Sequence, residues 1–235
     1  MITVRVPGIF SGRARKLDQP APKKGIARYF YIIFTHFWKY LALDLLFIVF
    51  SLPIITIPAA ICAHNRVCFL LTREGNCFLW SDFWNEFKCS IWRAVPIGLM
   101  YGVGVALGYY LLSIGAANDR SVFGVLFFAM GLTAVAYSLV AGSWTFALMA
   151  IQPLNNRTIL RNARAMTALE MPRGVLMVLA YGAVLALTLL LSPYSLVVLP
   201  FSLSFIQFTV CSIMNPAIEK RVLLGASDET DNEDS

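Results

Sequence analysis

The chain has 235 residues, of which 58 % are hydrophobic and 14 % charged, and its formal net charge is +6. Soluble globular domains carry about a quarter charged residues, so this composition, with a mean hydropathy of +0.69, excludes an ordinary soluble domain. The Lys and Arg residues lie in short segments beside apolar runs, which argues against nucleic-acid binding and indicates orientation in a lipid bilayer.

Three long stretches contain no Asp, Glu, Lys or Arg: residues 94–118, 121–156 and 174–218. The last covers 45 residues. A helix rises ~1.5 Å per residue and a hydrocarbon core is ~30 Å thick, so this stretch fits two short crossings and is too long for one. Backbone polar groups in lipid must be bonded internally, and each crossing is therefore predicted to be helical.

The two ends of the chain differ in composition from its centre. Residues 1–25 are basic and rich in Pro and Gly, and residues 222–235 are mostly acidic. Neither segment can bury enough apolar surface to fold, so both are predicted to be disordered tails. The transmembrane helical domain is predicted to cover residues 26–221.

The first apolar region, residues 29–71, contains Pro53 and Pro58 five residues apart. A proline inside a helix removes a backbone hydrogen bond and clashes with the preceding turn, so one straight helix through both is not expected. We predict a hairpin that turns near residues 52–57. Its returning leg, residues 58–72, is short, and it either crosses fully or re-enters.

The positions of the basic residues support this hairpin. If residues 29–63 crossed the membrane once, Lys and Arg would divide almost equally between the two sides. With a hairpin, 18 of the 19 lie on one side and only Arg120 lies on the other. Short cytoplasmic loops carry the excess of Lys and Arg. The hairpin therefore predicts a multi-pass protein of the bacterial plasma membrane with both termini in the cytoplasm.

Two further hairpins follow, formed by residues 94–117 with 122–151 and by residues 174–191 with 194–214. Glycines spaced for close helix contact occur on the first of these helices, at Gly98, Gly102, Gly104 and Gly108. The predicted fold class is an all-α polytopic membrane helix bundle. It consists of five full transmembrane helices plus one short or re-entrant leg.

Asp44 is the only acidic residue inside an apolar run. A carboxylate at membrane depth is costly and faces a partner or a wet cavity. The favoured role is a hydrogen bond or ion pair inside the bundle, with His64 or Arg66 as partner. Because His36 and Asp44 share one helical face, the alternative is a proton or cation relay or a polar contact to a substrate.

Neither a metal site nor an enzyme active site is predicted. The five cysteines show no CxxC spacing, and no second histidine lies at helical ligand spacing from His64. No phosphate-binding loop, nucleophile elbow or catalytic Cys/His pair is present. We therefore expect no cofactor and no catalytic activity.

Two cytoplasmic segments are candidate surfaces for a partner or for lipid. Residues 77–93 combine aromatic and basic side chains, as expected for a helix lying in the headgroup region; the candidate contacts there are Trp84, Phe87 and Lys88. Residues 154–172 place three basic side chains on one helical stripe, which we call the arginine stripe: Arg157, Arg161 and Arg164. Anionic lipid or a cytoplasmic protein is the expected contact.

The run Phe50–Ala60, then Leu70–Glu74, then Asp82–Lys88 resembles the YesL-like family of small bacterial membrane proteins. That family's pattern is a Leu-Pro-x-x-Thr-Ile-Gly turn, a short apolar leg, a charged segment and an aromatic, basic amphipathic segment. Here Pro58 stands where the family has Gly. The resemblance implies genes beside carbohydrate importers and glycoside hydrolases, and it implies no catalytic residues.

These observations lead to two function hypotheses. The first is a non-catalytic accessory subunit of a carbohydrate uptake system, which binds a membrane permease or its ATPase through residues 77–93 and 154–172. The alternative is a stand-alone small-solute transporter or channel, with Asp44 lining the path. The first is favoured because ion-coupled carriers have several polar groups at mid-depth. Substrate, partner identity and oligomeric state do not follow from the sequence.

Overall fold

The computed structural model describes residues 35, 37–74, 77–118, 121–152, 154–190 and 195–218, with the side chains of residues 73–74 and 195–204 left out. Every regular element in this part of the chain is a helix, so the predicted all-α class is confirmed. The elements are α2 (Phe37–Ser51), the 3-10 helix η1 (Ile54–Thr56), α3 (Ile57–Glu74), α4 (Leu79–Ala117), α5 (Val122–Ile151), α6 (Asn156–Leu169), α7 (Met171–Leu190) and α8 (Ser195–Ile218). Both predicted tails lie outside the described residues.

The predicted break at the two prolines is present. α2 ends at Ser51, Pro53 precedes η1, and Pro58 is the second residue of α3, where its missing N–H has no helical partner to lose. The hydroxyl of Thr56 lies 2.7 Å from the carbonyl oxygen of Phe50 and 2.6 Å from that of Pro53. It thus supplies a donor to the carbonyl of Phe50, which the end of α2 leaves without an intrahelical partner.

The returning leg, α3, is the central helix of the described structure. It is 18 residues long and contacts α2, α4, α5 and α8. Its small side chains are fully buried; they are Ala59, Ala60, Cys62, Ala63 and Cys68. Small residues let neighbouring helices approach closely inside a membrane. Surrounding protein, more than lipid, therefore covers this leg, which explains why its sequence is less apolar than that of a lipid-facing span.

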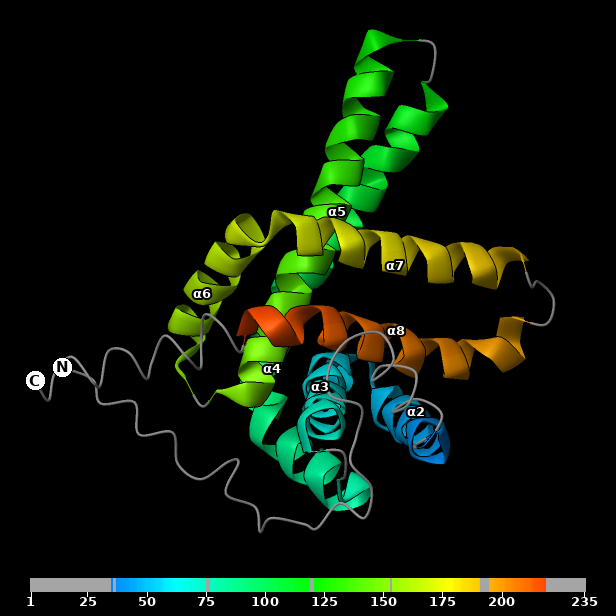
Figure 1. Ribbon diagram of the computed structural model, residues 1–235. Helices are drawn as coiled ribbons and strands as arrows, with labels where there is room; N and C mark the ends of the chain where they lie inside the picture. The colour runs from blue at the N-terminus through cyan, green and yellow to red at the C-terminus, as the bar shows by residue number, and fades with distance from the viewer. Residues whose placement is uncertain are drawn as a thin grey trace, which may run out of the picture.

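The amphipathic segment 77–93 is not a separate helix, which corrects the sequence-based prediction. It continues into the apolar run as one 39-residue helix, α4, with Pro96 inside it. Figure 1 shows α4 changing direction between its first turns and its long upper part. Proline removes the hydrogen bond to the carbonyl four residues earlier and kinks a helix, so Pro96 accounts for the bend within this one continuous helix.

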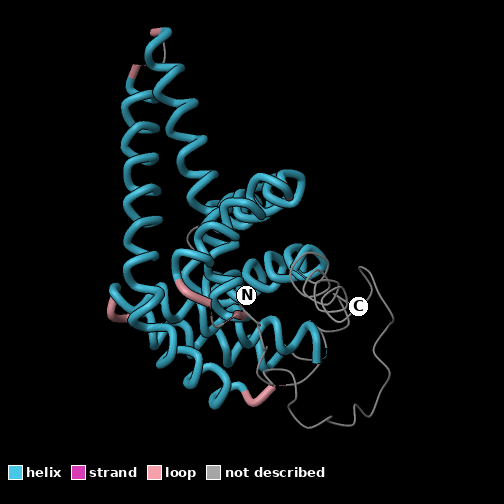
Figure 2. The backbone as a smooth tube through the Cα atoms, turned by 90° about the vertical axis from the view of Figure 1, so that its left-hand side faces the viewer, coloured by secondary structure: helices cyan, strands magenta, loops and turns pink. Residues whose placement is uncertain are grey.

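α4 and α5 form the long predicted hairpin, and its far half extends beyond the other helices in both views (Figures 1 and 2). α7 and α8 lie side by side and cross α5 at a large angle (Figure 1). α6 joins α5 to α7. The crossing hairpins leave a space between them that the site described below occupies.

Four described segments are long and apolar enough to cross a membrane: Ile54–Thr72, Leu79–Ala117, Val122–Ile151 and Met171–Leu190. The described apolar part of α8, Phe205–Ile218, is shorter, and α2 covers 15 residues. Large apolar side chains face outward along α4 and α5, including Leu107, Tyr109, Phe123 and Leu132. Such surfaces are unusual on soluble monomers and are expected against lipid. The chain is therefore a membrane protein.

The predicted glycine contacts are present at some positions and absent at others. A Cβ atom on Gly108 would lie 2.7 Å from Val135 Cγ2 and 3.1 Å from the carbonyl oxygen of Gly131. At Gly102, by contrast, no atom lies within 4 Å of that position. Gly108 thus sits at a close approach of α4 and α5, and Gly102 faces open space.

We predict that Gly108→Ala destabilises the protein by about 1–3 kcal/mol, because the added methyl group overpacks a contact with backbone atoms. Gly102→Ala is the matched control on the same helix. It should be neutral or stabilising by up to ~1 kcal/mol, since alanine favours a helix. Thermal unfolding in detergent measures both; equal effects of the two changes would contradict this packing.

Candidate functional site

Two arginines bind backbone carbonyls at the end of α5 and in the segment that follows it. Arg66 of α3 donates to the carbonyl oxygen of Ala150, in the last turn of α5, at 3.2 Å. Arg93 of α4 donates to the carbonyl oxygen of Leu154 and to Oδ1 of Asn156, the latter at 3.4 Å. The last carbonyls of a helix have no partner within it and carry partial negative charge, so Arg66 stabilises the end of α5. Arg93 instead binds the segment between α5 and α6 and the start of α6.

Asn156 completes the contact in the other direction, because its Nδ2 donates to the carbonyl oxygen of Arg93 at 3.3 Å. This reciprocal pair fixes the first residue of α6 against α4. Sequence reasoning missed the pair, since Arg93 and Asn156 lie 63 residues apart and neither belongs to a recognisable motif. We call Arg66, Arg93 and Asn156 the inner junction.

Glu86 lies near the inner junction, in the amphipathic part of α4 ahead of the charge-free run that begins at Ala94. Ser90 donates a hydrogen bond of 2.6 Å to its carboxylate. Glu86 is partly buried and lies within electrostatic range of the positive charges of Arg66 and Arg93. Glu86 is thus a charged neighbour of Arg66 and Arg93 that sequence reasoning did not single out.

Three of the four residues of the candidate polar site lie in described helices, Asp44 on α2 and both His64 and Arg66 on α3. Asp44 is buried, with 1 % of its surface exposed. His64 is also buried; its ring packs edge-on against Phe47 with 5.5 Å between centroids, and its Nδ1 lies 3.6 Å from the sulfur of Cys68. Arg66 belongs to the inner junction. His36 lies outside the described residues.

The aromatic side chains of residues 77–93 form a cluster around Phe50 of α2. Its ring centroid lies 4.9 Å from that of Phe87 and 5.2 Å from that of Trp84. Phe87 is only 8 % exposed, so its assignment to a docking surface is corrected: it belongs to the core. Lys88 is exposed, with its Nζ 4.5 Å from the centre of the Trp84 ring, a cation–π contact.

The arginine stripe is exposed along one face of α6. The buried residues of α6 are Ile159, Ala163 and Met166, and helical geometry places them on the opposite face. Glu170, the acid at the end of α6, forms an ion pair with Arg173 at 2.5 Å. The structure thus presents three cations on a helix whose other side is fixed to the bundle.

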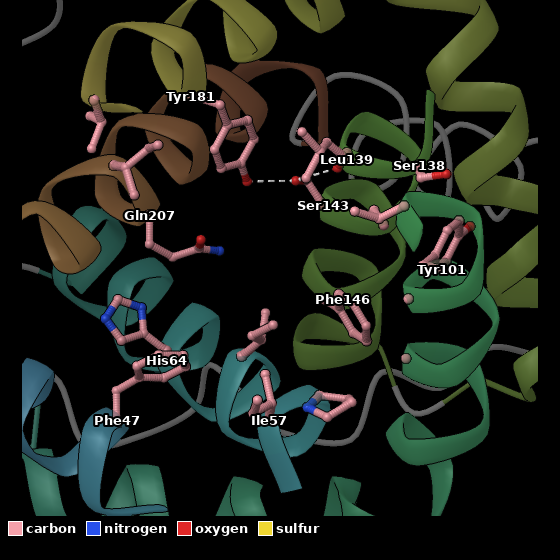
Figure 3. A pocket seen from close by; sticks show the side chains of 18 of the residues that line it. Phe47, Ile57, His64, Tyr101, Ser138, Leu139, Ser143, Phe146, Tyr181 and Gln207 are labelled. Atoms are coloured by element: carbon pink, nitrogen blue, oxygen red, sulfur yellow. Dashed lines mark hydrogen bonds between the residues drawn. The ribbon is translucent and has the colours of Figure 1, made fainter. Parts of the chain in front are cut away.

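A cavity of about 580 Å³ lies where α2, α3, α4, α5, α7 and α8 meet. Figure 3 shows Phe47, Ile57 and Phe146 along one part of its wall, and His64, Gln207, Tyr181 and Ser143 along another. The lining residues in the part of the chain that the structure describes are mostly apolar and include no Asp, Glu, Lys or Arg. Asp44 is not among them. The volume and the few polar groups are typical of a small-molecule site.

The polar groups of the wall are held by bonds to α5 and α3. Ser143 donates to the carbonyl oxygen of Leu139 at 2.8 Å, and its oxygen lies 2.8 Å from the hydroxyl of Tyr181 (Figure 3). Gln207 donates from Nε2 to Oδ1 of Asn65. Sequence reasoning missed this cavity, because its walls come from helices far apart in the chain and its residues are ordinary in apolar spans.

Among the described residues, no group of three or more His, Cys, Asp or Glu side chains is placed to hold a metal ion. The cysteines are free thiols, and four of the five are buried. The arrangement suits reversible binding of an uncharged molecule, since the cavity wall offers hydrogen-bonding groups but no carboxylate.

Comparison with known proteins gives one match. A family described as "Protein of unknown function, DUF624" matches residues 40–111, which cover most of α2, all of α3 and most of α4. YesL-like proteins belong to that family. No curated protein and no solved structure matches the chain. The chain is thus similar to this family over the segment that forms the central helix and the kinked α4.

Proposed function

We propose that the protein is a non-catalytic accessory subunit that docks a cytoplasmic partner through the arginine stripe. The observation that supports this most is the position of Arg157, Arg161 and Arg164 on the exposed face of α6. Three cations on a fixed helix beside a membrane attract an acidic surface. The inner junction holds the start of this helix against α4, so the stripe is presented in one orientation.

The partner class follows from the resemblance to YesL-like proteins, whose genes lie beside carbohydrate importers. We propose that the partner is the permease or the ATPase of such an uptake system, in the bacterial plasma membrane. Lys88 and the exposed Trp92 on α4 extend the docking surface; Phe87 no longer belongs to it. An acidic segment of the partner would meet the stripe.

The alternative, a transporter or channel with Asp44 lining the path, has less support. A coupled carrier places ionisable groups at its central site. Among the described residues that line the cavity there is no carboxylate, and Asp44 is not one of them.

The first prediction here concerns the stripe. Arg157→Gln, Arg161→Gln and Arg164→Gln combined should leave the protein folded in detergent, because these side chains are exposed. Each charge near an acidic surface contributes about 1 kcal/mol, so association should weaken by at least about tenfold. The measurement is purification in mild detergent followed by quantitative mass spectrometry of co-purified permease and ATPase subunits.

Arg93→Gln is the matched control, because it removes a single arginine that binds inside the protein. It should lower the thermal stability, since the carbonyl of Leu154 and the side chain of Asn156 lose their donor. If the triple variant aggregates while Arg93→Gln does not, the stripe is structural and the docking proposal fails.

The second prediction concerns orientation. With 18 of the 19 Lys and Arg residues on one side, both termini should face the cytoplasm. Alkaline phosphatase and fluorescent-protein fusions after Arg28 and after Gly225 measure this. A periplasmic signal at either end would reject the hairpin topology, and the stripe would then face the wrong compartment for a cytoplasmic partner.

The third prediction separates the two hypotheses. Asp44→Asn should leave folding and membrane insertion nearly intact, because asparagine keeps the shape and most of the hydrogen-bonding capacity. Association with the partner should also be unchanged. A pH-dependent uptake of solute that disappears on this change would favour the transporter hypothesis instead.

A further inference from the structure

The cavity between the crossing hairpins has walls that suit an aliphatic ligand. Phe47, Ile61, Val105, Leu139 and Ile206 are among its lining residues. An engineered apolar cavity of ~150 Å³ binds benzene, which has six carbon atoms. By that ratio, 580 Å³ holds roughly 20 non-hydrogen atoms, the size of one long acyl chain with a small head.

The cavity is open on the side of α4 and α7. Gly102 and Leu185 both line it, yet both are exposed, Leu185 to 63 %. The surrounding outward-facing side chains are apolar and include Val103 on α4 and Leu189 on α7. Because these helices are apolar enough to cross a membrane, an opening on this side would be reached from the bilayer.

Two polar groups of the wall can accept a hydrogen bond from a ligand. Since Ser143 donates its proton to the carbonyl of Leu139, the hydroxyl of Tyr181 donates to Ser143. The oxygen of Tyr181 then keeps its acceptor capacity on the cavity side (Figure 3). Gln207 donates to Asn65, so its amide oxygen is also an acceptor. Both groups match a ligand with hydroxyl donors.

We propose that this cavity binds a neutral single-chain lipid with a hydroxyl-bearing head, such as a monoacylglycerol. A charged head is disfavoured because no Asp, Glu, Lys or Arg is among the described residues that line the cavity to pair with it. A sugar is disfavoured because hydroxyls on all its sides would face aliphatic walls and lose their hydrogen bonds to water. The proposal is independent of the docking function.

The test uses the full chain in phosphatidylcholine nanodiscs and measures retained radiolabelled monooleoylglycerol, with empty nanodiscs as the blank. Gly102→Leu fills the cavity from a position where an added Cβ meets no atom within 4 Å, and it should abolish the retention above the blank. Gly182→Leu on α7 is the matched control. It has equal free space but does not line the cavity, so it should bind as the unchanged protein does.

A second variant keeps the proposal testable if Gly102→Leu fails to fold. Tyr181→Phe removes one neutral hydrogen bond of about 0.5–1.5 kcal/mol, so the affinity for monooleoylglycerol should fall about 2- to 12-fold. Methyl oleate has no hydroxyl donor, and its weaker binding should not change. The proposal is overturned if the unchanged protein retains no more lipid than empty nanodiscs. Equal retention by a folded Gly102→Leu variant, or stronger binding of lysophosphatidylglycerol than of monooleoylglycerol, would also overturn it.

Discussion

The burial of α3 by its neighbours is the constraint on which the rest of the structure depends. In lipid, helices gain little from hiding apolar surface, so their association rests on close van der Waals packing and on internal hydrogen bonds. α3 supplies the first through buried small residues such as Ala59, Ala60 and Ala63. It supplies the second through Arg66, which binds the end of α5. α2, α4, α5 and α8 all pack on this one helix.

The inner junction then determines where the exposed charges lie. Arg66 can reach the carbonyl of Ala150 only if α3 and α5 are already packed together, so this contact depends on the packing around α3. In turn, Arg93 and Asn156 fix the start of α6. The arginine stripe is therefore held by contacts on the opposite side of the same helix. The exposure of the stripe thus results from contacts that other residues make.

The sequence predicted those features of the fold that local chemistry determines. Pro53 and Pro58 broke the first apolar region because a proline cannot continue a helix at those positions, and the charge-free runs predicted helices because lipid allows little else. Pro96 was not anticipated as a kink within one continuous helix, since the amphipathic and apolar parts of α4 differ in composition. Phe87 was assigned to a surface because its partner, Phe50, lies 37 residues earlier, and no local pattern reports that contact.

The cavity shows the same limit more sharply. Its hydrogen-bonded chain from Tyr181 through Ser143 to Leu139 joins α7 to α5. Tyr181 and Ser143 are not unusual within their own segments, so only the crossing of the hairpins creates the site. α3 and α5 contribute to both the cavity and the inner junction: His64 lies two residues from Arg66, and Ser143 lies ~10 Å along the helix from Ala150. A ligand changes the presentation of α6 only if it binds two arrangements of these helices unequally. Because α3 and α5 contribute to both places, coupling between the cavity and α6 would act through these two helices.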